Sequence, residues 1–218
     1  MKRYLIAAAM FLALTGAAFT QVKATVKSMT GKVEIMPSGG AWQTARVGMK
    51  LDKGAFISTG FSSTAVLDVG SSVLTVSALT RMQLAELVAR QDSVSTELYL
   101  RVGKVRAEVK AVEGVRQNFI LRSPQSTAAV RGTEFEFDGL TVTVVNGLVT
   151  FSNTIGQSRG VSAGEESFVS GDDVPTAGDE QRDVQTSVDP YTAPPDVDIP
   201  QPPPSSPPLP ATVIIRWQ

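Results

Sequence analysis

The segment "EFEFDG" (134–139) carries three carboxylates at alternating positions, Glu134, Glu136 and Asp138. Alternate residues of a strand share one face, so these side chains present their oxygens together as candidate ligands for Ca²⁺. A calcium site needs about six to eight oxygens, and no neighbouring loop supplies the remaining ones. We therefore expect a solvated outer strand face here and no metal site.

A second group of charges is basic. Four cations, Arg101, Lys104, Arg106 and Lys110, are interleaved with an apolar set. That set comprises Leu100, Val102, Val105, Ala107 and Val109. The pattern predicts a basic band, which either meets an anionic envelope polymer or is a charged outer face; we expect the outer face.

The composition excludes most catalytic chemistry, because the chain contains no histidine and no cysteine. Histidine is the commonest general base and metal ligand, and cysteine supplies thiolates, disulfides and lipid-anchored N-termini. There is also no phosphate loop, dinucleotide fingerprint or Ser-x-x-Lys motif. We expect a protein that is not an enzyme, with no catalytic residues and no cofactor.

The first residues have the pattern of a secretory signal peptide, which we assign to 1–24. Lys2 and Arg3 precede an apolar core from Tyr4 to Leu14, and small residues follow at candidate cleavage sites between Ala18 and Ala24. The apolar run is short for a spanning helix, which needs about 20 residues, although an uncleaved anchor is the alternative. We expect a periplasmic or secreted protein that does not span the membrane after cleavage.

Residues 25–171 have the length of one domain and a pattern typical of half-buried strands. Short runs such as "TAVLDV", "ELYLRV" and "LTVTVV" alternate apolar and polar residues and end at Gly, Ser, Asn or Pro. The segment 79–90 fits either a helix or a strand. With 15 Lys and Arg against 13 Asp and Glu, the domain has a net charge of +2, which does not favour nucleic-acid binding.

A loose internal repeat runs through this domain. The segments "MTGKVEI" (29–35), "RVGKVRAEV" (101–109) and "VNGLVTF" (145–151) each place a Gly two residues before a Val. The pattern predicts a strand, a tight turn or bulge and another strand, and Asn146-Gly147 is the strongest hairpin signal. Chance recurrence of a common pattern is the alternative.

Two sequence blocks resemble the FecR domain family. One is "LDKGAFISTGFSSTAVLDVGSSVLTVSALTRMQL" (51–84); the other is "SPQSTAAVRGTEFEF" (123–137), followed by "VTVVNGLVTF" and "VSAGEE". The matching motif residues are Gly54, Thr59, Gly60, Arg131, Gly132, Thr133, Phe135, Gly147 and Gly164. Ala55 departs from the family, which usually has an acidic residue there.

The resemblance implies an all-β periplasmic domain, a solenoid-like or β-roll stack of short strands that turn at glycines; the alternative is a β-sandwich. Gly132 would then turn a corner ahead of a strand that buries Phe135 and Phe137. Arg131 would be either a solvated corner residue or a buried clamp on carbonyls and a carboxylate; we expect the clamp. Founding members of the family span the inner membrane and have a cytoplasmic anti-sigma segment ahead of the periplasmic domain. In this chain we expect only a signal peptide ahead of the domain, so the signalling role of the founding members is not carried over.

The composition changes at residue 172. Residues 172–210 are acidic and rich in Pro, with one Arg against eight acids, a net charge of −7, and they predict a disordered linker. Residues 211–218, "ATVIIRWQ", predict a terminal strand with Val213, Ile215 and Trp217 on one face. Such a strand either docks on its own domain, capping an open edge, or binds a partner; we expect the first.

Two functions follow from these observations. The first is an exported, non-enzymatic envelope protein whose domain is a binding or scaffold module for an unknown envelope protein or polymer. The second is a periplasmic sensor or regulatory module that works with a separate membrane partner.

Overall fold

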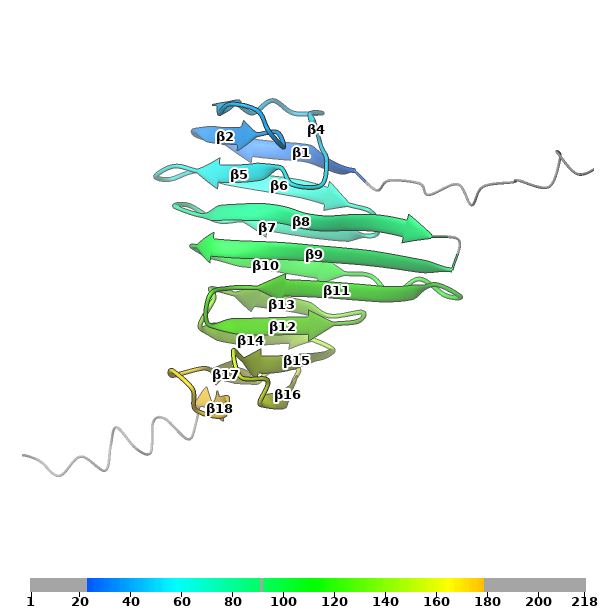
Figure 1. The fold of residues 1–218 in the computed structure, drawn as a ribbon, viewed down its shortest axis with the longest axis vertical. Helices are drawn as coiled ribbons and strands as arrows, with labels where there is room; N and C mark the ends of the chain where they lie inside the picture. The colour runs from blue at the N-terminus through cyan, green and yellow to red at the C-terminus, as the bar shows by residue number, and fades with distance from the viewer. Residues whose placement is uncertain (1–22, 91, 179–218) are drawn as a thin grey trace, which may run out of the picture.

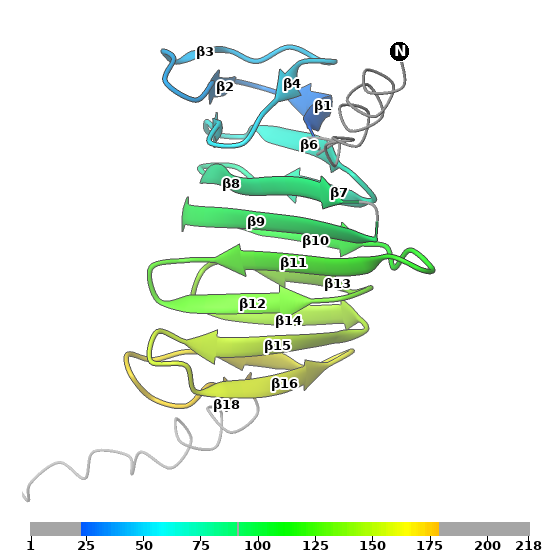
Figure 2. The same cartoon turned by 45° about the vertical axis from the view of Figure 1, so that its right-hand side comes forward.

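The computed structural model describes residues 23–90 and 92–178 as an all-β fold (Figure 1). Within these residues no helix is long and apolar enough to cross a membrane. The strands form two nine-stranded sheets, here called sheet A and sheet B, that face each other (Figure 2). The prediction of an all-β domain is confirmed. Most of the predicted signal peptide, most of the predicted acidic linker and the predicted terminal strand lie outside the described residues, although Ala24, assigned to the signal peptide, is the first residue of β1.

Sheet A has the order β16-β15-β12-β11-β9-β8-β5-β2-β3. Its strands are β2 (Val33–Met36), β3 (Gln43–Thr44), β5 (Phe56–Thr59), β8 (Arg81–Arg90), β9 (Ser93–Val102), β11 (Arg116–Arg122), β12 (Ser126–Val130), β15 (Leu148–Asn153) and β16 (Ser158–Ser162).

Sheet B has the order β18-β17-β14-β13-β10-β7-β6-β1-β4. Its strands are β1 (Ala24–Thr30), β4 (Lys50–Leu51), β6 (Thr64–Val69), β7 (Ser72–Val76), β10 (Val105–Val109), β13 (Glu134–Phe137), β14 (Thr141–Asn146), β17 (Glu166–Phe168) and β18 (Thr176–Ala177). The sheet therefore continues past residue 171, where composition alone placed the end of the domain.

The chain passes repeatedly from one sheet to the other, so both sheets grow in the same direction along the sequence (Figure 1). Neighbouring strands are antiparallel except β9 and β11, which are parallel because β10 between them lies in sheet B. The strand ends form two rims. The first rim comprises the turns at 31–32, 60–63, 77–80, 103–104, 123–125, 138–140 and 154–157, and the second rim those at 70–71, 110–115, 131–133, 147 and 163–165.

The core fills the space between the sheets and follows strand alternation. Phe135 and Phe137 of β13 are fully buried, as predicted, while Glu134 and Glu136 point outward. Phe135 meets Phe119 of sheet A edge-on at 6.4 Å, and Phe137 meets Phe151 in the same way at 6.3 Å. Each buried ring stabilises the fold by roughly 1.5–3 kcal/mol.

The ambiguous segment 79–90 is mostly strand, since β8 starts at Arg81. The register of β8 against β9 shifts between Leu84 and Glu86, which marks a β-bulge. The bulge puts the buried Leu84 and Leu87 three residues apart and explains the helix-like spacing.

Candidate functional site

The loose repeat of the sequence is one recurring corner. Gly31, Gly103 and Gly147 each have a positive φ, of 72°, 100° and 93°, at a point where the chain crosses between sheets. Each packs so closely on a Ser or Thr of a neighbouring corner that an added Cβ would lie 2.4, 2.2 and 2.8 Å from its hydroxyl oxygen. Only glycine fits such a position.

At each of these corners, the Ser or Thr hydroxyl forms hydrogen bonds with the backbone of the glycine's corner and with the backbone of its own corner. The N–H of the residue after each glycine donates to Ser63 at 2.9 Å, to Thr80 at 3.0 Å and to Thr133 at 3.3 Å. Each hydroxyl also lies within hydrogen-bonding distance of the carbonyl two residues before it. These three side chains are buried, so the corners satisfy backbone groups that would otherwise be costly.

Thr133 explains the Val-Arg-Gly-Thr signature. Its hydroxyl donates to the carbonyl of Leu148 at 2.9 Å and so joins the corner before β13 to the corner at Gly147. Gly132 has a φ of 64°, and an added Cβ would lie 3.1 Å from that of Ala111, so the predicted corner is present. Arg131 is exposed, and its guanidinium forms no ion pair or hydrogen bond with any described residue. The buried-clamp prediction is wrong, because this side chain points away from the core at the turn.

The remaining motif residues are also structural. The Thr59 hydroxyl donates to the Ser77 carbonyl and accepts from Thr80 N–H at 3.0 Å, and Gly60 N–H donates to Lys32. Gly54 has a φ of 86° and would bring a Cβ 2.8 Å from Ser38 Oγ, whereas Gly164, at 83°, has open space around it. Ala55 is 1% exposed, so this position belongs to the apolar core here.

The predicted basic band is not one surface. Arg101 lies on β9 in sheet A, whereas Lys104, Arg106 and Lys110 lie on or beside β10 in sheet B. The alternating spacing suggested that the four cations share one face. They do not, because the chain changes sheets at Gly103, and a pattern along the sequence cannot show such a change. Arg106 donates to Glu134 at 2.6 Å and to Glu136 at 3.4 Å. The hydrogen bond to Glu134, followed by its charge, raises the pKa of Arg106 above its usual value.

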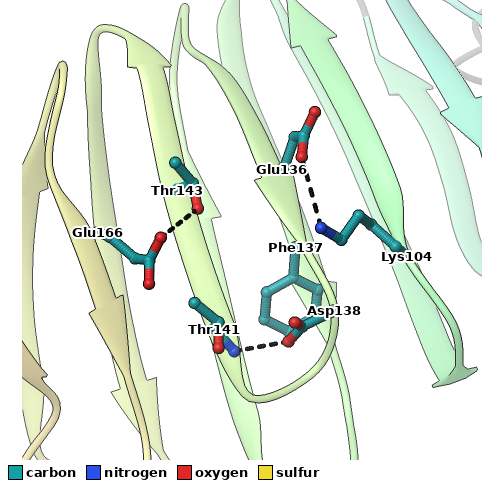
Figure 3. Close-up of a pocket in the computed structure, with 7 residues that line it drawn as sticks. All are labelled: Lys104, Glu136, Phe137, Asp138, Thr141, Thr143 and Glu166. Carbon is teal, nitrogen blue, oxygen red and sulfur yellow. Dashed lines mark hydrogen bonds and ion pairs between the residues drawn. The ribbon is translucent and has the colours of Figure 1, made fainter. Parts of the chain in front are cut away.

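A shallow hollow of about 240 Å³ lies on the same outer face of sheet B (Figure 3). Lys104 is 3.7 Å from Glu136, Glu166 accepts from Thr143 at 3.2 Å, and Asp138 accepts the Thr141 N–H at 2.7 Å. The three carboxylates first considered for Ca²⁺ are thus engaged by cations or a turn. No described group of Asp and Glu is arranged to hold a metal ion.

The segment "GQSRG" (156–160) has the Gly-x-Ser-x-Gly spacing of a nucleophile elbow. The elbow requires a strand followed by a helix, but these residues form the turn between β15 and β16 and the start of β16. Ser158 is exposed, and the chain has no histidine to activate it. These residues therefore lack the strand-to-helix turn of a nucleophile elbow.

Sheet A presents a different surface, here called the aromatic–arginine patch, formed by Trp42, Phe56, Arg81 and Arg101. The guanidinium of Arg81 lies 5.3 Å from the centre of the Trp42 ring, and that of Arg101 lies 5.4 Å from the Phe56 ring. The two rings are 6.5 Å apart. Neither arginine pairs with a carboxylate among the described residues.

Register builds this patch, so the sequence alone did not show it. Arg81 of β8 is opposite Ser58 of β5 and Val102 of β9, which brings it within two residues of Phe56 and Arg101 on the neighbouring strands. The members of the patch are separated by many residues in the chain. The available signal was that Phe56, Arg81 and Arg101 sit at outward positions of strands.

Four strands form the sheet edges. β3, β4 and β18 have two residues each, whereas β16 has five. Val213, Ile215 and Trp217, the predicted docking strand, lie outside the described residues, so their docking stays a prediction.

Residues 55–150, from the approach to β5 into β15, match the sequence profile of the family described as FecR protein. This part of the chain is therefore similar to the FecR family. This match includes Thr59, Gly60, Gly147 and the segment 131–133, so the FecR profile covers most of the corner residues described above.

Two crystal structures of a candidate anti-sigma factor from Parabacteroides distasonis ATCC 8503 are similar, with 21% identity and a TM-score of 0.46. The alignment covers 59% of this chain and 62% of that chain, so this protein spans less than two thirds of its length. No curated protein matches the chain.

Proposed function

We propose that this is an exported, non-enzymatic cell-envelope protein whose FecR domain is a binding module for an envelope protein or polymer. The observation that carries the proposal is the aromatic–arginine patch on sheet A, where two guanidinium groups stack on rings and have no described carboxylate partner. A stacked guanidinium is held in place yet keeps its N–H donors free for an anionic partner. The favoured partner therefore carries carboxylate or phosphate groups.

The outer face of sheet B supports this assignment by contrast. Its cations are already neutralised, since Arg106 pairs with Glu134 and Glu136, and Lys110 with Glu108 at 3.5 Å. A ligand there would have to break existing pairs before forming its own. Binding without catalysis is further supported by the composition, which has neither histidine nor cysteine.

A matched pair of variants tests the binding surface. The tagged mature protein, Arg81→Ala/Arg101→Ala and Lys104→Ala/Arg106→Ala would each be incubated with solubilised envelope fraction and washed at two salt concentrations. Both variants lose two positive charges, so a nonspecific charge effect weakens both equally. We expect the sheet A variant to lose at least ten-fold of the captured material and the sheet B variant to retain it. Equal capture by all three proteins would contradict the proposal.

The proposal of export rests on the signal-peptide pattern of residues 1–24, which favours a location in the periplasm or outside the cell. The expected N-terminus of the exported protein is near Phe19 or Thr25. N-terminal sequencing checks this directly, and a chain that begins at Met1 in the membrane fraction would contradict it.

A second candidate function is a periplasmic sensor or regulatory module that works with a separate membrane partner, and the FecR match favours it. The capture experiment separates the two. Recovery of an inner-membrane protein with a cytoplasmic regulatory segment would favour the sensor, whereas recovery of an envelope polymer or outer-envelope protein would favour the scaffold.

We also propose that the architecture is best described as solenoid-like. Both sheets grow in chain order, and the same glycine–hydroxyl corner recurs three times, as expected of stacked repeats. A β-sandwich is the alternative description of two facing sheets.

A further inference from the structure

Exposed apolar side chains gather along the first rim and form what we call the apolar column. Its members are Phe61 (82% exposed), Leu79 (51%), Val102 (58%), Leu140 (45%), Ile155 (61%) and Val174 (50%). Single exposed apolar residues are ordinary, but a continuous series marks an interaction surface.

Backbone contacts connect the upper members of the column. Leu79 N–H donates to the Gly60 carbonyl at 3.2 Å, which joins the corner of Leu79 to that of Phe61. Gly103, next to Val102, packs against Thr80, next to Leu79. Consecutive corners thus present consecutive apolar side chains.

The lower members continue the same line. Val102 and Leu140, with Pro124 between them in sequence, line a hollow of about 190 Å³. Below it, the Asn153 amide donates to the Asp172 and Asp173 carbonyls at 3.1 and 3.0 Å, which brings the loop of Val174 beside the turn that contains Ile155. The column therefore ends four residues before Gly178, where the described chain ends.

Leu79 adds an independent observation. Its φ is 55°, a conformation that is strained for a leucine, and its side chain nevertheless stays half exposed. A strained residue that gains little burial within its own domain is typical of a side chain held for contact with something else.

We infer that the apolar column is the docking surface of the chain's own terminal segment, residues 209–218. This segment follows a 30-residue stretch from Asp179 to Pro208 and carries Val213, Ile215 and Trp217 in alternation. In polyproline form that stretch spans roughly 90 Å, whereas the six strand steps from β16 to β5 cover only about 29 Å. The segment can therefore reach every member of the column.

The rim fits this segment better than the open edge at β16. Of the five residues of β16 only Val161 is buried, and Gly160 lies in the middle, so a strand added there would find few apolar neighbours on that edge strand. The column instead offers six exposed apolar side chains and a hollow for a large ring. Docking thus places the terminal segment across the corners.

Engineered cysteines test the placement, because the chain has none of its own. Ile215→Cys would be combined, in the full mature chain, with Val102→Cys on the column, Arg159→Cys on β16, or Val145→Cys on the second rim, whose native residue is 46% exposed. We expect an intrachain disulfide in the Val102 pair at least five-fold faster than in the other two, at a rate independent of protein concentration. Preferential reaction of the β16 pair, equal rates in all three, disulfide-linked dimers or no disulfide would each overturn the inference.

Trp217 fluorescence gives a second measurement that needs no cross-link. In a Trp42→Phe background, Val102→Asp should shift the Trp217 emission to longer wavelength, whereas Val145→Asp should leave it unchanged. Emission typical of an exposed indole before any substitution on the rim would overturn the docking.

Discussion

The corners and the outer faces of the two sheets use polar groups in opposite ways. At the corners, Ser63, Thr80 and Thr133 are buried and their hydroxyls bond backbone groups of a neighbouring corner. On the outer faces, charged groups such as Arg106 and Glu134 are about one third to one half exposed and bond other charged side chains of the surface. Removing a corner hydroxyl leaves backbone groups without a partner, whereas water replaces the partner of a surface charge.

This difference shows which residues determine the fold and which are free for function. The corners at Gly31, Gly103 and Gly147 leave no room for a larger side chain. We expect the faces to tolerate substitution, so that their composition can be selected for a partner. The residues that resemble the FecR motif fall mainly on corners, so in this chain they support the fold more than a binding surface.

The largest expected effect is at Gly103. In Gly103→Ala the new Cβ would lie 2.5 Å from the Thr80 Cα, a backbone atom that cannot move alone. With the strain of a φ of 100°, we expect a loss of about 3 kcal/mol or more in the free energy of unfolding. Urea denaturation would measure it.

Gly156→Ala is the control for that experiment. Gly156 also has a positive φ, of 87°, but nothing lies within 4 Å of an added Cβ. Only the backbone strain remains, so a loss of about 1 kcal/mol is expected. Equal losses in the two variants would mean that the close packing of the corner does not matter.

Gly132→Val should be intermediate. A β-branched residue at a φ of 64° is strained, and its Cβ would press on Ala111 at 3.1 Å, a side chain in a loop that can yield. We expect a loss of roughly 2 kcal/mol in urea melts, against little change for Arg131→Ala, whose side chain is exposed. A shift within error at Gly132 would show an ordinary loop glycine.

Thr133→Val isolates the hydroxyl from the shape of the corner. It removes the bonds to the N–H and C=O of Leu148 at nearly constant volume, and we expect a loss of about 1–2 kcal/mol. Thr143→Val is the matched control, because that hydroxyl lies on the exposed face of sheet B and bonds Glu166. Equal losses in the free energy of unfolding for the two variants would show that the buried Thr133 hydroxyl does not stabilise the corner.

The smallest effect is expected for the exposed pair Asp92–Arg116. The hydrogen bond from Arg116, followed by its charge, lowers the pKa of Asp92 below its usual value. The pair therefore stabilises the fold above the ordinary pKa of aspartate, and this contribution is lost as the pH falls through the lowered value. Arg116→Ala should return the pKa of Asp92 toward its ordinary range in an NMR titration, with no measurable change in melting temperature near neutral pH. An unchanged titration would show that the pair does not form in solution.

Alternation and turn residues predicted most of the strands, because each strand has one buried face and the pattern is local. Phe135 and Phe137 were placed in the core by strand alternation within the all-β domain that the family resemblance implied. The glycines were also predictable as turns, although their partners were not, since Thr80 and Gly103 meet only through the stacking of corners. The prediction that Arg131 is buried was wrong, because the sequence around it does not indicate whether the side chain of a turn residue points toward the core or toward solvent.

The candidate site was less predictable for the same physical reason. A pattern along the chain cannot show when the chain changes sheets, so Arg101 was grouped with Lys104 and Arg106. Trp42, which precedes β3, comes near Arg81 of β8 only because β3 pairs with β2, β2 with β5 and β5 with β8. The sequence therefore predicted which residues are exposed on strand faces, but not which of them lie together on one surface.

One experiment tests the division between corners and faces most directly. Urea stability and capture of envelope material would be measured on the same preparations of Thr133→Val and Arg81→Ala/Arg101→Ala. We predict that Thr133→Val lowers the free energy of unfolding but that the folded protein captures as much envelope material as the parent. Arg81→Ala/Arg101→Ala should keep its free energy of unfolding within about 0.5 kcal/mol of the parent and lose capture. A corner variant that loses capture while fully folded, or a patch variant that captures normally, would contradict the account.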